Sequence, residues 1–144
     1  MKCKIHITKI LFLIILTIFF SCDTPKSKIP EVYVNFEINI NHLEYRDLKV
    51  IGNSIYVTGG VKGIIIFRKG TDEFIAYERC CPYDPDCGRV FIDESGYNAK
   101  DTICCNSEFS LLISGGANSG PSEFPMKMYT TVYNIYSGVL RVSN

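Results

Sequence analysis

The stretch VYVNFEINI, residues 32–40, shows the pattern that decides the class of fold. Valine, phenylalanine and isoleucine occupy every second position, and tyrosine, asparagine and glutamate stand between them. Neighbouring side chains of a strand point to opposite faces of a sheet, so a period of two over nine residues predicts a half-buried β-strand.

Short β-rich segments continue along the chain, separated by turn signals such as Gly59-Gly60 and Ser137-Gly138. The segments that we predict as strands are residues 54–58, 63–68, 74–79, 89–92, 109–113, 126–132 and 138–142. No window of about 12 residues or more after the N-terminal segment shows a helical stripe. We therefore expect one all-β domain over residues 32–144, with seven to nine short strands in a small sandwich or barrel.

The N-terminal residues predict export. Residues 1–9 contain three lysines and no acidic residue, and an apolar run broken only by Thr17 follows at residues 10–20. As a helix this run would span about 16 Å, which is too short to cross a bilayer. A basic segment followed by a short apolar run is typical of a signal peptide, here residues 1–21.

The end of this run, ILTIFFSC, resembles a bacterial lipobox, with Phe19 where an aliphatic residue is usual. The resemblance implies that Cys22 is acylated and becomes the mature N-terminus, while Cys3 is removed with the signal peptide. The alternative is ordinary cleavage, with Cys22 an incidental thiol. Residues 22–31, polar with two prolines, are then a tether. We expect a cell-envelope protein held at the membrane by lipid, with the inner or outer membrane left open.

Charge and motifs exclude several classes of function. Without residues 1–21 the chain has twelve basic and fifteen acidic residues, a net charge of −3, and no run of lysines or arginines. Nucleic-acid binding therefore lacks its usual electrostatic support. The chain has no P-loop, GxSxG or HExxH motif, so we expect no enzyme. We interpret the acidic residues of the central region as loop solvation: Glu78, Asp84, Asp86, Asp93 and Glu94.

Five cysteines gather in two segments, ERCCPYDPDCG at residues 78–88 and TICCNSEF at residues 102–109. A four-sulfur zinc or [2Fe–2S] site would draw on Cys80, Cys81, Cys87, Cys104 and Cys105. Structural zinc sites, however, favour ligands separated by two to four residues, and adjacent side chains diverge in an extended chain. An exported chain favours disulfides, and five cysteines allow fifteen arrangements of two bridges. We expect no cofactor.

The order of three loops in the second half of the chain resembles the Rieske iron–sulfur fold. Cys81-Pro82-Tyr83 stands where that family has Cys-x-His, and residues 102–109 stand where it has Cys-x-x-His-Gly-Ser-x-Phe. Ser119-Gly120-Pro121 matches its Gly-Pro loop, and the strand pair ending at residue 142 matches its closing hairpin. The resemblance implies a small β-sandwich or barrel whose head consists of two cysteine loops under a third.

The ligand positions depart from the family. A Rieske cluster is held by two cysteines and two histidines, and the corresponding positions here are Cys81, Tyr83, Thr102 and Cys105. Only Cys81 is kept, and His42 is the one histidine after the signal peptide, so an ordinary Rieske centre is excluded.

The resemblance also implies a pairing, because some members of the family join the two ligand loops by a disulfide. The equivalent pair is Cys87 and Cys104. Cys81 and Cys105 stand where two ligands would converge, and they could bond directly if the cluster is absent. Cys80 would remain unpaired.

These observations leave three alternative functions for the protein. The first is a non-catalytic binding or structural module, and the second is an electron carrier with an all-cysteine iron–sulfur or zinc site. The third is a thiol–disulfide redox protein, but the chain lacks a C-x-x-C motif, and apart from Arg79 no histidine or lysine stands near the cysteines to lower a thiol pKa. We expect the first, with an unknown ligand or protein partner.

Overall fold

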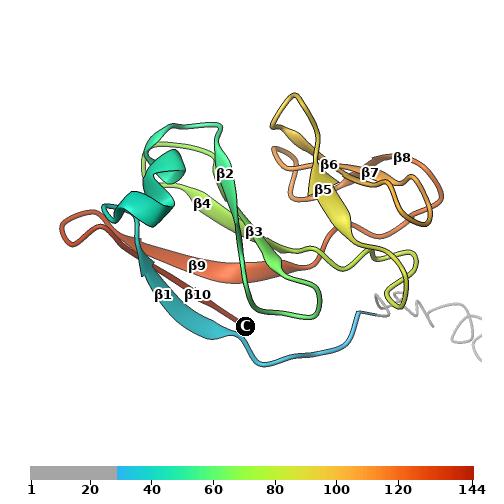
Figure 1. The fold of residues 1–144 in the computed structure, drawn as a ribbon, viewed down its shortest axis with the longest axis horizontal. Coiled ribbons are helices and arrows are strands. Elements are labelled where there is room, and N and C mark those ends of the chain that lie inside the picture. The colour runs from blue at the N-terminus through green and yellow to red at the C-terminus, as the bar shows by residue number, and fades with distance from the viewer. Residues whose placement is uncertain (1–28) are drawn as a thin grey trace, which may run out of the picture.

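The computed structural model describes residues 29–144, which form two antiparallel sheets (Figure 1). The prediction of an all-β fold is confirmed. The predicted signal peptide (residues 1–21), Cys22 and the predicted tether up to residue 28 lie outside the described residues. Residues 29–31 already contact the domain: Ile29 is buried, and Lys127 Nζ lies 2.8 Å from Glu31 Oε2.

The first sheet has six strands in the order β1-β10-β9-β4-β3-β2. Ile64 of β3 lies opposite Glu78 of β4, whereas β4 and β9 share only the pairs Ala76–Tyr129 and Tyr77–Met128. The strands are β1 (Asn35–Asn39), β2 (Ser54–Val57), β3 (Ile64–Arg68), β4 (Phe74–Glu78), β9 (Met128–Asn134) and β10 (Val139–Ser143).

The second sheet has four strands in the order β5-β6-β7-β8. In sequence it lies between β4 and β9, which are neighbours in the first sheet, so the chain leaves that sheet and returns to it (Figure 1). The strands are β5 (Val90–Ile92), β6 (Asn98–Asp101), β7 (Glu108–Ser110) and β8 (Ala117–Ser119).

The structure differs from the sequence prediction in three elements. Strands β6 and β8 were not predicted, because their sequences, NAKD and ANS, are short and mostly polar. A 3₁₀ helix, η2 (Leu43–Lys49), also escaped prediction and packs against β2 and β3. The ten strands of the described region therefore exceed the seven to nine expected.

The strand β3 is buried on both faces. Ile64 and Ile66 belong to one hydrophobic cluster, and Ile65 and Phe67 belong to the other. The first cluster joins Leu48 of η2 to residues of the six-stranded sheet, and the second joins β3 and β4 to the four-stranded sheet. One strand thus supplies side chains to both cores.

A buried tyrosine joins the two sheets. Tyr77 of β4 is fully buried, and its hydroxyl donates a hydrogen bond to the carbonyl oxygen of Leu111 at 2.7 Å. Burial raises the pKa of Tyr77 to about 12, so the phenol stays protonated and remains a donor at neutral pH.

Within residues 29–144, no helix has the length and apolar character needed to span a bilayer.

We predict that Tyr77→Phe lowers the free energy of unfolding by about 1–3 kcal/mol, because the buried Leu111 carbonyl loses its partner while packing is kept. Urea unfolding followed by circular dichroism measures this. Tyr136→Phe is the control, since Tyr136 is 98% exposed and should change stability very little. Equal stability of the two variants would show that the hydrogen bond does not tie the sheets together.

Candidate functional site

Three loops lie together at one end of the four-stranded sheet, and we call them the head. They are the first loop (residues 80–89), the second loop (residues 102–107) and the third loop (residues 120–125). A disulfide between Cys87 and Cys104 joins the first loop to the second, with Cα atoms 6.2 Å apart. These are the two cysteines that the sequence analysis paired.

The side chains of two further cysteines in the head lie in contact but are not bonded to each other. The sulfurs of Cys81 and Cys105 lie 3.2 Å apart, whereas a disulfide bond is about 2.05 Å long. The second bridge considered from the sequence is therefore absent from the structure, and both residues are free thiols. Burial raises the pKa of Cys81 well above its ordinary value, so this thiol is protonated at neutral pH.

A buried carboxylate organises the second loop. Asp101 Oδ1 accepts the backbone N–H groups of Ile103 at 3.0 Å and Cys104 at 3.1 Å, and Asp101 Oδ2 lies 3.1 Å from the sulfur of Cys105. Burial alone would raise the pKa of Asp101, but the hydrogen bonds from Cys105 and the two backbone N–H groups outweigh it and lower that pKa. Asp101 is thus an ionised acceptor.

Ser107 links the second and third loops. Its hydroxyl accepts the backbone N–H of Ser122 at 3.1 Å, and it lies 3.2 Å from the sulfur of Cys105. Cys105 has one thiol proton, so it can donate to Asp101 or to Ser107 at one time, and the carboxylate is the stronger acceptor. The centre of the head is therefore a closed polar network.

Two glycines allow the loops to approach this closely. A Cβ atom at Gly88 would overlap the Cys81 side chain and the Asp101 carboxylate. At Gly120, where φ is +90°, a Cβ atom would lie 2.5 Å from Ser107 Cα. Neither position has room for a side chain.

The four positions matched to cluster ligands do not converge. Cys81 and Cys105 meet, but Tyr83 is 52% exposed and Thr102 is also on the surface. These residues, with no imidazole among them, do not fit a Rieske cluster.

The sulfurs of Cys81 and Cys105 and a carboxylate oxygen of Asp101 lie within 4.8 Å of one another, so this group could hold a metal ion. Asp101 was missed in the sequence, although an aspartate that accepts backbone N–H groups two and three residues later is a known turn signal. A second such group, Asp84 with Cys87 and Cys104, has both sulfurs committed to the disulfide.

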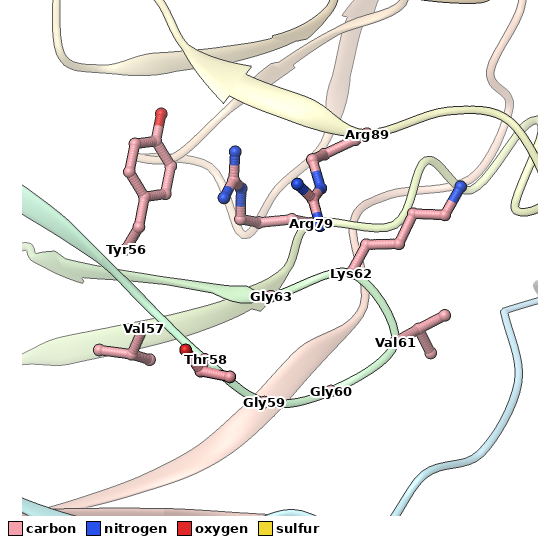
Figure 2. A pocket seen from close by; sticks show the side chains of 10 residues that line it. All are labelled: Tyr56, Val57, Thr58, Gly59, Gly60, Val61, Lys62, Gly63, Arg79 and Arg89. Carbon is pink, nitrogen blue, oxygen red and sulfur yellow. The ribbon is translucent and has the colours of Figure 1, made fainter.

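A separate pocket of about 500 Å³ lies beside the first loop (Figure 2). It is lined by Tyr56, by the glycine turn (residues 58–63) that precedes β3, and by Arg79 and Arg89. Because Lys62 of that turn also lines it, basic residues from three different segments line this pocket, and we call it the basic pocket. The sequence did not predict it, since its cations are up to 27 residues apart.

A second buried carboxylate shapes the glycine turn. Glu78 is completely buried, and its oxygens accept the backbone N–H groups of Val61 at 2.7 Å, Lys62 at 2.9 Å and Cys80 at 3.0 Å, and the Tyr129 hydroxyl at 2.7 Å. The interpretation of Glu78 as loop solvation was therefore wrong. Alternation along β4 turns this side chain inward, where the turn supplies donors for it.

Arg79 is held rigidly at the floor of the basic pocket. Its guanidinium carbon lies 3.9 Å from the centre of the Tyr56 ring, and its Nε donates to the Val90 carbonyl oxygen at 3.1 Å. Burial lowers the pKa of Arg79, yet an arginine keeps its charge at neutral pH. Lys62 Nζ donates to the carbonyl oxygens of Asp86 and Gly88, which connects the pocket to the first loop.

Neither a protein-family model nor a curated protein sequence matches the chain. The functional argument therefore rests on the head and the basic pocket.

We predict that Cys87→Ser lowers the free energy of unfolding by about 3 kcal/mol, because it removes a cross-link between residues 17 apart. Thermal or urea unfolding measures this, and non-reducing peptide mapping should recover the fragment containing Cys87 and Cys104. Reductant is the matched control, since it should bring the wild type to the stability of the variant. Alkylation of all five cysteines in unreduced native protein would contradict the disulfide.

Proposed function

We propose that the protein is a non-catalytic binding module of the cell envelope, with a Rieske-like head that has lost the usual ligands of the metal cluster. The observation that carries this proposal is the hydrogen-bonded network at the ligand positions, where Cys81 meets Cys105 and Cys105 contacts the Asp101 carboxylate. Support for the family comes from the three loops, which lie together in the expected chain order and are followed by the β9–β10 hairpin.

Two of the three free thiols, those of Cys80 and Cys81, are poorly suited to thiol–disulfide exchange. Burial raises the pKa of Cys80 to about 11 and also raises that of Cys81, whereas the reactive form of cysteine is the thiolate. The sulfur of Cys80 lies 3.3 Å from the Pro85 carbonyl oxygen, inside the first loop. These thiols have the character of packed core residues.

One observation favours a second candidate function, a metal site. Cys81, Asp101 and Cys105 would offer two sulfurs and one carboxylate oxygen, donors that zinc accepts. Metal binding would require both thiols to lose their protons, against the burial that raises the pKa of Cys81. We rank this site below the binding module for that reason.

Attachment to the membrane remains a proposal from the lipobox resemblance. If Cys22 carries the lipid, only residues 23–28 separate it from the part of the chain that contacts the domain, which begins at residues 29–31. The seven Cα–Cα steps from Cys22 to Ile29 span at most about 25 Å. The domain would then work close to the membrane surface.

We predict that protein purified without oxygen contains no stoichiometric iron or zinc and shows no visible absorption bands, because the head lacks the histidine ligands of a Rieske cluster and burial keeps the Cys81 thiol protonated. Metal analysis and an absorption spectrum measure this. About two irons per chain with sulfide would overturn the proposal in favour of an electron carrier. One zinc per chain that Cys105→Ser removes would favour the metal site.

We predict that Cys22→Ala releases the protein from the membrane fraction or leaves it uncleaved, because the acyl chains have no attachment point. Cell fractionation with intact mass measures this. Cys3→Ala is the control, since Cys3 belongs to the proposed signal peptide and should leave anchoring unchanged. A processed Cys22→Ala protein in the membrane fraction, with no acyl mass on the wild type, would refute lipidation.

A further inference from the structure

The basic pocket concentrates positive charge that no carboxylate neutralises directly. Lys62, Arg79 and Arg89 take part in none of the ion pairs found within residues 29–144. Arg79 and Arg89 are close enough to repel each other, and their guanidinium groups lie between Tyr56 and Lys62 in Figure 2. An anion in this pocket would relieve that repulsion.

Glu78, the carboxylate that acts electrostatically on Arg79, already has hydrogen-bond partners. Glu78 attracts Arg79 electrostatically, but both of its oxygens are used by backbone N–H groups and by the Tyr129 hydroxyl. Lys62 Nζ has only carbonyl oxygens as partners, from Asp86 and Gly88. The pocket therefore offers cationic donors to a ligand.

Arg79 is arranged so that its outer nitrogens are available. Its Nε is bound to the Val90 carbonyl oxygen, and its guanidinium carbon lies 3.9 Å from the Tyr56 ring centre and 5.0 Å from that of Phe91. Its two Nη atoms have no hydrogen-bond partner within residues 29–144. Every fully buried side-chain nitrogen of that region does have a partner, so the two Nη atoms are not fully buried and are accessible. The planar fork is fixed before a ligand arrives, which reduces the entropy cost of binding.

Tyr56 adds a neutral donor. Its hydroxyl oxygen accepts the backbone N–H of Ile92 at 2.8 Å, so its proton is free to point toward a ligand.

We propose that the basic pocket binds a phosphate group, either as inorganic phosphate or as the phosphate of a larger molecule such as a lipid headgroup. This inference rests on the proposed binding function and names its ligand class. Three cations exceed the single charge of a carboxylate, whereas a phosphate monoester carries close to two charges and several acceptor oxygens for guanidinium forks. A volume of about 500 Å³ also leaves room for a group attached to the phosphate.

Calorimetric titration of the full chain in detergent, in buffer without phosphate, tests the proposal with inorganic phosphate, glycerol 3-phosphate and acetate. We expect both phosphates to bind at least about tenfold more tightly than acetate, with an affinity that falls as salt rises. Equal affinities for the two phosphates would identify the free anion as the ligand. Tighter binding of glycerol 3-phosphate would identify an organic phosphate such as a headgroup.

Variants locate the site. Arg89→Gln should weaken phosphate binding at least about tenfold without unfolding the protein, because the Arg89 side chain is exposed. Arg79→Lys keeps the charge but loses the fork, so it should weaken binding as well. Arg46→Gln is the matched control, since Arg46 is exposed in η2, pairs with Asp47, and should leave binding unchanged.

Failure to bind either phosphate, equal binding of acetate, or unchanged binding by Arg89→Gln would overturn the inference. Metal and disulfide analysis of the same sample separates this result from the proposed function. If the protein is metal-free and disulfide-bonded but does not bind phosphate, only the proposed phosphate site is refuted. If the protein contains an iron–sulfur cluster and still binds phosphate, only the proposal of a cluster-free head is refuted.

Discussion

The burial of β3 on both faces is the constraint on which the rest of the structure depends. Ile64 and Ile66 enter one core while Ile65 and Phe67 enter the other, so both sheets need this strand. A shift of register by one residue would exchange two apolar sets, which the hydrophobic effect alone resists only weakly. Glu78 supplies the missing specificity, because it lies opposite Ile64 and binds the backbone of the turn that precedes β3.

The end of β4 serves both candidate sites in consecutive residues. Glu78 holds the glycine turn, Arg79 forms the floor of the basic pocket, Cys80 pairs with Arg89 at the base of the first loop, and Cys81 enters the head. The carbonyl oxygens that bind Lys62 belong to the first loop, so this loop contacts the basic pocket and is also part of the head. A change in the first loop would therefore be felt at the basic pocket.

A disulfide and a hydrogen-bond network give the head a different physical character from a metal centre. Cys81, Asp101, Cys105 and Ser107 satisfy one another, and Gly88 and Gly120 let the loops close around them. Such an arrangement stabilises loops that have little regular structure. In the proposed function the head is a support, and recognition takes place beside it.

Local pattern in the sequence determined the strands with alternating or continuous apolar residues, the all-β class, the two cysteine segments and the single histidine of the described region. Tertiary structure alone decided the rest. The polar strands β6 and β8 form because neighbouring strands complete their hydrogen bonds. Cys87 bonds to Cys104, rather than to another of the five cysteines, because the fold brings these two residues face to face. The buried roles of Glu78 and Asp101, and the meeting of Lys62 with Arg79 and Arg89, depend on contacts between distant segments, which no local pattern of residues encodes.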